Sequence, residues 1–329
     1  MKTILTSVVV GYLLATLAMA QPSPPVVGNA PRVLPYTEIQ SASSQADPAA
    51  QPHRRWGLPH PATRRKGDDS ASAHNRLLVY VITGGLQFGA VDLRSGTFLQ
   101  IGPGLPPDVG AGLVPGRGKT LLTLSFSGNL DAVDPATGRT AVVGATGLGD
   151  CSTPASPCGP NSANVIGQLD DDYYATDFAQ NLYSVNPRTG AAKLIGPTGI
   201  PAITFIPFSA NPDGSLNVYA ESLFSARGML YANFATASLN PATGTATPIV
   251  PGALYQINPK TGHARLVAPT DTSLTSTVNV NETIYAFDAA TEQVVTLDVT
   301  NGLTTAVSDL DPEAGVIGGA TPVRPREKD

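Results

Sequence analysis

Apolar residues recur along this chain in short runs separated by clusters of turn-forming residues. In the clearest copy, Leu182 to Val185 alternates large and small residues, which is typical of a strand packed on both faces. Asn186 to Gly190 (NPRTG) combines an Asx side chain, a proline and a glycine, so it predicts a chain reversal. A second apolar run, Ala191 to Ile195, stops at Gly196-Pro197. Each copy is therefore predicted to be a β-hairpin.

Near-copies of this hairpin recur through the chain. Their turn glycines are 42, 52, 72 and 40 residues apart, at Gly96, Gly138, Gly190, Gly262 and Gly302. A propeller blade of four strands needs about 40 to 45 residues, and a two-stranded ribbon cannot bury its own faces, so the copies are expected to stack as blades. The two long intervals contain insertions: a cysteine-bounded loop, Asp150 to Asn161, and an additional hairpin turn, Asn240 to Gly244.

The predicted fold is therefore an all-β propeller of five four-stranded blades over residues 75–323. Six blades is the alternative, if Leu216 to Phe224 and the hairpin after it form a separate blade. The first blade has only three strands in its own stretch, Leu77 to Ile101. We expect Gly315 to Thr321 to supply its inner strand, because closing the ring removes exposed sheet edges.

The N-terminal part of the chain differs in composition from the repeats. Residues 1–20 combine Lys2, an apolar run and Ala18-Met19-Ala20, which predicts a secretory signal peptide. Residues 21–74 are rich in Pro, Ala, Ser and Gln and are predicted to be a disordered linker or pro-segment. Its basic stretch, Pro52 to Lys66, indicates a solvated linker open to proteases, with an arm for nucleic acid or an anionic polymer as the alternative. Residues 324–329 form a charged tail.

These segments predict a secreted protein, extracellular or periplasmic, without a membrane span. Residues 75–329 carry 13 Lys and Arg against 21 Asp and Glu, a net charge of −8. This charge argues against nucleic acid or an anionic membrane as a partner of the folded part. We expect a monomer whose partner is an extracellular polysaccharide or protein.

The repeat also resembles a known group of proteins. The pattern Leu-Tyr-x-(Val/Ile)-(Asn/Asp)-Pro-x-Thr-Gly, found in Leu182 to Gly190 and Leu254 to Gly262, is similar to the repeat of secreted propellers related to the YVTN and quinoprotein-like propellers. The resemblance covers most of residues 76–323 and implies architecture, since many of these proteins have no assigned activity. Quinoprotein dehydrogenases of this architecture carry Trp-docking motifs, whereas the only Trp here, Trp56, precedes the repeats. We therefore expect no cofactor.

Few residues in the repeats suit catalysis or metal binding. Three of the four histidines precede the repeats, and the fourth, His263, follows a turn glycine, so neither a Ser-His-Asp triad nor a histidine metal cluster is expected. Asp170 to Asp172 occupies a predicted hairpin turn, where solvated acids are favoured over a calcium site. Cys151 and Cys158 enclose six residues after an export signal and are predicted to form a disulfide, with a metal or redox pair as the alternative.

The candidate ligand-binding residues are amides on predicted inner strands and isolated carboxylates, namely Asn164, Gln168, Asn279, Asp177 and Glu221. A channel lined by amides and hydroxyls favours neutral polar ligands such as sugars. The leading hypothesis is therefore a non-enzymatic binding module for an extracellular glycan or protein, with no catalytic and no metal-binding residues. The alternatives are a lactonase-like or glycosidase-like hydrolase or lyase that uses carboxylates on the top face, and a structural envelope protein.

Overall fold

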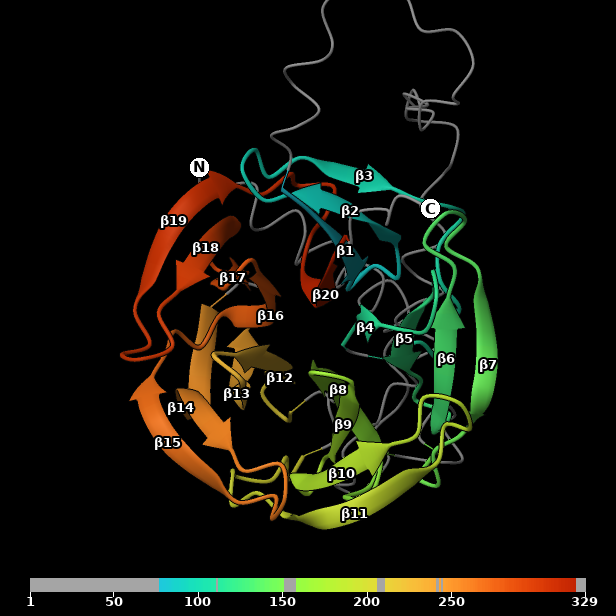
Figure 1. Cartoon of the computed structure of the whole chain (residues 1–329). Helices are drawn as coiled ribbons and strands as arrows, with labels where there is room; N and C mark the ends of the chain where they lie inside the picture. Colours follow the sequence, from blue (N-terminus) through green and yellow to red (C-terminus); the bar gives the residue numbers. More distant parts are fainter. Residues whose placement is uncertain are drawn as a thin grey trace, which may run out of the picture.

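The structure is a computed structural model that describes residues 77–110, 112–150, 158–205, 211–240, 243 and 245–323. Twenty strands form five antiparallel sheets of four strands each, arranged as blades around one central axis (Figure 1). The predicted five-bladed propeller is confirmed, and the alternative of six blades is not. The described residues include no helix, and so no helix that could cross a membrane.

From the innermost to the outermost strand, the five blades have the following bounds. Blade 1 contains β20 (Ile317–Pro322), β1 (Leu78–Thr83), β2 (Phe88–Asp92) and β3 (Phe98–Gln100); blade 2 contains β4 (Val114–Pro115), β5 (Leu121–Leu124), β6 (Asn129–Val133) and β7 (Thr140–Ala145); blade 3 contains β8 (Ala163–Leu169), β9 (Asp172–Asp177), β10 (Asn181–Val185) and β11 (Ala192–Pro197); blade 4 contains β12 (Leu216–Ala226), β13 (Met229–Asn240), β14 (Thr245–Ile257) and β15 (Ala264–Pro269); and blade 5 contains β16 (Leu274–Val280), β17 (Thr283–Asp288), β18 (Gln293–Leu297) and β19 (Thr304–Asp309).

The C-terminal strand closes the ring, as predicted. β20 pairs antiparallel with β1, with Val81 opposite Ala320 and Val79 opposite Pro322. Ile317 is fully buried in a cluster with Val79 and Val81. Figure 1 shows β20 beside β1 at the inner side of blade 1, so the two ends of the propeller chain meet in one sheet.

Each outer hairpin turn is built as its sequence predicts. An Asp or Asn side chain accepts a hydrogen bond from the backbone N–H two residues later, over 2.8 to 3.2 Å, in Asp92, Asp134, Asn186, Asn258 and Asp298. The turn glycine that follows has a positive φ of 68° to 80° in every blade. Asx side chains and glycine are the residues that this tight turn requires.

The turn glycines also lie against the neighbouring blade. A Cβ atom on Gly190 would lie 2.3 Å from the carbonyl oxygen of Gly144 in blade 2. In every other blade, the turn glycine lies similarly close to a backbone atom at the end of the outer strand of the preceding blade. In blade 1, this contact joins Gly96 to Asp309 of blade 5. These contacts therefore form a closed circle around the ring.

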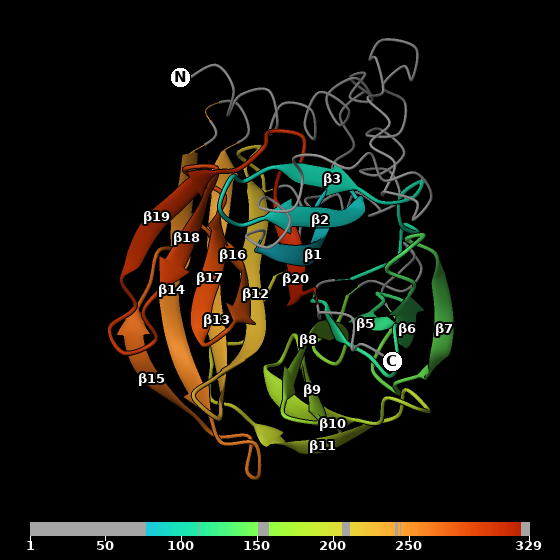
Figure 2. The same cartoon turned by 45° about the horizontal axis from the view of Figure 1, so that its top comes forward.

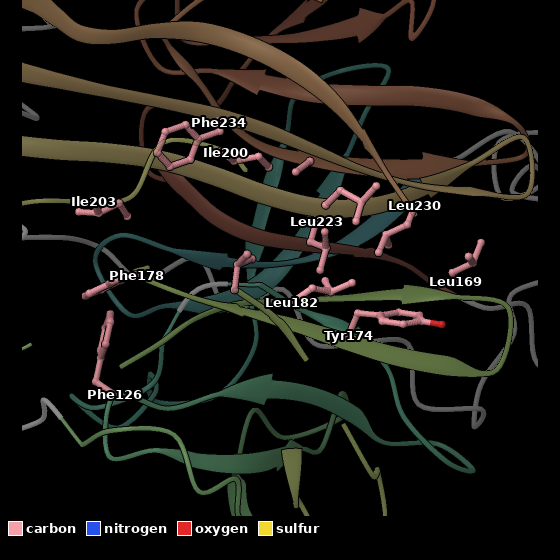
Figure 3. Close-up of a cluster of buried hydrophobic side chains, with 13 residues drawn as sticks. Phe126, Leu169, Tyr174, Phe178, Leu182, Ile200, Ile203, Leu223, Leu230 and Phe234 are labelled. Carbon is pink, nitrogen blue, oxygen red and sulfur yellow. The ribbon is translucent and has the colours of Figure 1, made fainter. Parts of the chain in front are cut away.

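The hydrophobic core lies between blades. The cluster in Figure 3 joins Leu182 and Tyr174 of blade 3 to Leu223, Leu230 and Phe234 of blade 4. Leu223 points to blade 3, whereas the next residue along β12, Phe224, packs in a separate cluster with Leu274 of blade 5. Alternate residues of an inner strand thus face opposite neighbouring blades, as the period of a strand requires.

Blade 4 is enlarged in its three inner strands. β12, β13 and β14 have 11, 12 and 13 residues, but β15 has 6 and pairs only with Ala253 to Ile257 of β14. Figure 2 shows these strands running past the short strands of blade 3. We call the part outside the regular blade, residues 216–220, 235–240 and 245–250, the blade 4 extension. It ends at the predicted additional turn, between Asn240 and Thr245.

Several sequence predictions concern residues outside the described ranges. The signal peptide of residues 1–20, the linker of residues 21–74 and the tail of residues 324–329 belong to this group, so they stay predictions. Cys158 packs at the edge of the blade 3 and 4 cluster, but Cys151 also lies outside, so the disulfide stays a prediction. His263 is an exposed residue next to the outer turn, in agreement with its expected place.

Candidate functional site

The five candidate ligand-binding residues fall into two groups at opposite ends of the inner strands. We call the end that carries the β9–β10 and β13–β14 turns the upper face. β8 begins there, because Ala163 pairs with Asp177 at the end of β9. Asn164, Asp177 and Glu221 lie together at this end, between blades 3 and 4. Gln168 and Asn279 lie at the opposite end, each near the hairpin turn that follows its strand.

The lower residues do not join a common site in the described part of the chain. Gln168 pairs with Tyr173 in the last part of the β8–β9 ladder. The Asn279 side chain donates to the carbonyl oxygen of Ser225 over 2.9 Å and accepts from the backbone N–H of Glu282 over 3.0 Å. Asn279 therefore connects blade 5 to blade 4 and fixes its own turn.

Glu221 is the centre of the upper group. It lies on β12 with 3% of its surface exposed and points to blade 3. Its Oε1 accepts a hydrogen bond from the Thr176 hydroxyl over 2.8 Å. Its Oε2 accepts from the Gln180 amide nitrogen over 2.7 Å and from the Asn164 amide nitrogen. We call these four residues the Glu221 cluster.

Two acceptors in the Glu221 cluster have no partner. The amide oxygens of Asn164 and Gln180 are both buried, and neither receives a hydrogen bond in the described part of the structure. A buried acceptor without a partner costs about 1 to 3 kcal/mol, so such atoms are uncommon in folded proteins. Each of these two amide oxygens could therefore accept one further hydrogen bond.

Asp177 belongs to the architecture of its blade. Its Oδ1 accepts from the backbone N–H of Asn181 over 2.8 Å, and its Oδ2 accepts from the Asn181 amide and from the Tyr183 hydroxyl. The equivalent turns contain the same hydrogen bond. The hydroxyl oxygens of Thr83 in blade 1 and Ser125 in blade 2 each accept from the backbone N–H four residues later. The side chain of Asp177 therefore stabilises the β9–β10 turn.

The electrostatics of the upper group follow from burial. Burial raises the pKa of Glu221 to about 7, although its three hydrogen bonds oppose this rise, and the like charge of Asp177 adds to it. Burial also raises the pKa of Tyr183 to about 12, together with its hydrogen bond to Asp177. Glu221 is therefore a carboxyl group that titrates near neutral pH.

Sequence reasoning did not identify Thr176 and Gln180. Thr176 directly follows the buried apolar run Tyr173 to Ala175 on β9, and a polar residue at this place in a strand is the signal that could have identified it. Nothing in the sequence marks Gln180, which lies in the β9–β10 turn with a φ of 63°. Its contact with Glu221 depends on how two blades pack.

Above the Glu221 cluster, the blade 4 extension presents both aromatic and polar groups. Tyr219 packs edge-on against Phe178 of blade 3, with ring centroids 5.7 Å apart. The start of β12 carries a polar network in which the Asn211 amide donates to Ser215 and Asn217 over 2.9 and 3.0 Å. Ile249 on β14 is 52% exposed. The extension therefore offers a mixed surface on the upper face.

A small pocket lies on the same face between blade 5 and the segment that leads into β20. Its volume is about 40 Å³, and its lining includes Asp288, Glu292, Leu310, Pro312 and Val316. This is room for a few water molecules and not for a sugar ring. Within the described ranges, no three His, Cys, Asp or Glu side chains gather as metal ligands would.

No protein-family model matches the sequence, and no curated protein matches it either. Solved structures with a similar fold include a nidogen/laminin complex, at 12% identity and a TM-score of 0.41, over 74% of this chain and 97% of the other. The PQQ-bound aldose sugar dehydrogenase from Streptomyces coelicolor is similar at 15% identity and a TM-score of 0.37, over 68% and 86% of the two chains.

Glutaminyl cyclase from Myxococcus xanthus is similar at 12% identity and a TM-score of 0.29, over 65% and 71% of the two chains. These neighbours are β-propeller proteins, and they include an enzyme that carries a cofactor as well as a protein seen in a complex. Likeness at this level carries no information about what the present chain binds or does.

Proposed function

We propose that this chain is a secreted propeller of the YVTN and quinoprotein-like type that binds an extracellular glycan or protein on its upper face, without turning it over. The blade 4 extension is the part that we assign to binding. The observation that carries the proposal is the unequal size of the blades: among the strands that the structure describes, only three strands of blade 4 have 11 to 13 residues.

The ring itself does not require this extension. Blades 3 and 5 close their contacts to blade 4 with inner strands of seven residues. The longer strands add a three-stranded surface with exposed Ile249 and, where β12 begins beside the end of β13, the Asn211 network. Recognition in rigid scaffolds is commonly carried by such additions on one face. A surface that mixes amides, hydroxyls and an aromatic ring suits a neutral polar ligand.

The carboxylates of the upper group support binding over catalysis. Both oxygens of Asp177 are occupied by groups of its own turn. Glu221 is enclosed between two blades and accepts three protein hydrogen bonds. A general acid or nucleophile has to reach its substrate within hydrogen-bond distance, and both Asp177 and Glu221 are buried away from the surface where a substrate would lie.

A hydrolase or lyase of the lactonase or glycosidase type is the second candidate. The observation in its favour is that Glu221, whose pKa is about 7, lies close to a second carboxylate, Asp177. Carboxyl groups with a raised pKa are the usual general acids of such enzymes.

A glycan array run beside a panel of lactone, ester and glycoside substrates separates the two candidates. We expect saturable binding to the array and no turnover by the chain. Ile249→Glu should weaken binding by about tenfold or more. Leu303→Glu is the control and should not weaken binding, because Leu303 is also an exposed apolar residue (69%) but lies beside the outer turn of blade 5, away from the extension. Equal binding by both variants would remove the extension from the site. Turnover that disappears in Glu221→Gln would establish the enzyme instead.

A further inference from the structure

We propose that Glu221 is a neutral carboxylic acid whose hydrogen bonds join blade 4 to blade 3 below the blade 4 extension, and that loss of its proton weakens this junction. We call this junction the clasp. The clasp is a property of the fold and does not depend on the proposed binding function. It rests on the contacts of the Glu221 cluster.

The first argument is the count of donors and acceptors. Glu221 meets the hydroxyl of Thr176 and the amide groups of Asn164 and Gln180. The nitrogen and oxygen of an amide occupy interchangeable positions, and the hydrogen-bond network decides between them. A neutral Glu221 can donate its O–H to the amide oxygen of Asn164 and still accept from Thr176 and Gln180. In this orientation the Asn164 oxygen receives a donor, which an ionised carboxylate cannot supply because it only accepts, and the Asn164 nitrogen turns to the position that the oxygen leaves.

The second argument is the set of groups that face Glu221. The charged group that acts on it is Asp177 of β9, which has the same sign and therefore favours the neutral acid. Tyr183 of β10 donates to Asp177, and Tyr219 precedes Glu221 by two residues on β12. Phe234, opposite Glu221 on β13, is fully buried and apolar. An ionised carboxylate in these surroundings lacks a cation to pair with among the described residues.

The third argument is the location of the clasp. Asn164, Thr176 and Gln180 belong to blade 3, whereas Glu221 belongs to blade 4, at the point where β12 passes into the extension. All four side chains are at least 97% buried. An ionised Glu221 would need water, which can reach it only if the two blades separate at this end. The proton therefore controls how firmly the base of the extension is held.

The sign of the pH dependence follows from the direction of the pKa change. The pKa of Glu221 rises from its ordinary value of 4.5 in the unfolded chain to about 7 in the folded protein. Its stabilising contribution is therefore complete below pH 4.5 and is lost as the pH rises through 7. This is opposite to the behaviour of a salt-bridged carboxylate.

The test compares the melting temperature of the full mature chain with that of Glu221→Gln between pH 5 and pH 8. The Gln amide is uncharged, can donate to the Asn164 oxygen and can accept from Thr176, so in these respects it imitates the neutral acid. We expect the wild-type melting temperature to fall by about 5 °C or more, relative to Glu221→Gln, as the pH rises. Glu282→Gln, at an exposed turn position, should follow the wild type.

A wild-type melting temperature that rises relative to Glu221→Gln over this range would overturn the proposal, as would parallel curves. A stabilising effect of CaCl₂ at pH 8 that Glu221→Gln lacks would also overturn it, because the cluster would then bind a cation. If Glu221→Gln does not fold, infrared difference spectra of the wild type between pH 5 and pH 8 decide. A buried carboxylic acid band that disappears in this range supports the clasp, and its absence at pH 5 refutes it.

Discussion

Gly190→Ala tests whether the outer turns hold neighbouring blades together. Gly190 has a φ of 80°, and a Cβ atom there would lie 2.3 Å from the carbonyl oxygen of Gly144 in blade 2. Alanine in this left-handed conformation costs about 1 to 2 kcal/mol. The contact with a backbone atom adds about 1 to 3 kcal/mol, because the blades have to move apart to relieve it.

Gly147→Ala is the matched control for this variant. Gly147 has a φ of 82°, and its Cβ atom would meet no atom within 4 Å. Both variants share the backbone strain and the effect of glycine removal on the unfolded chain, so the difference between them isolates the contact between blades. The free energy of unfolding, measured in urea at pH 7, should be about 1 to 3 kcal/mol lower for Gly190→Ala than for Gly147→Ala. Equal stabilities would refute the idea that this turn spaces the blades.

Three further predictions follow from the closure, the β9–β10 turn and the cysteines. Removing residues 316–329 deletes Ile317 and the strand β20 that pairs with β1. Loss of the buried Ile317 side chain alone costs about 2 to 5 kcal/mol, so the melting temperature should fall by at least about 5 °C. An unchanged melting temperature would contradict the closure of the ring by β20. In Tyr183→Phe, the loss of the bond to Asp177 should lower the free energy of unfolding by about 1 kcal/mol at pH 7. Because the pKa of Tyr183 is about 12, its contribution is present below pH 10 and lost as the pH rises through 12, so the variant should lack this part of the alkaline loss in a pH titration of stability. Cys151→Ser should leave the melting transition of the propeller in place, because closing so short a loop stabilises by roughly 2 to 3 kcal/mol at most; global unfolding of this variant would argue against that.

The repeat made the architecture readable from the sequence. Each outer turn combines an Asx residue with a glycine, and this local chemistry depends on neighbours in the chain alone, so the turns at Asn186 and Asn258 lie where they were expected. The interval of 18 residues between Gly244 and Gly262 was too short for a blade, and the structure places a longer hairpin there. Ring closure was predictable because an incomplete first blade needs a partner strand.

The candidate site was less predictable, because it depends on packing between blades. Asn164 and Gln168 are both amides on β8, but four residues of strand span about 13 Å, which separates the two faces of the ring. Glu221 meets residues that are 41 to 57 positions away in the sequence, from two strands and a turn. These residues meet because blades 3 and 4 pack against each other in one particular orientation. That orientation cannot be predicted from a single sequence.

The circle of glycine contacts determines where this fold can accept additional residues. The outer strand of blade 4 is fixed at both ends, since its turn at Gly262 lies against Gly196 and its last residue, Pro269, lies against Gly302. Blade 4 accordingly keeps a six-residue outer strand while its three inner strands are about twice as long. An engineer who wishes to graft a new recognition segment onto this ring should therefore lengthen inner hairpins at the upper face, because inserting residues at the outer turns would break the circle.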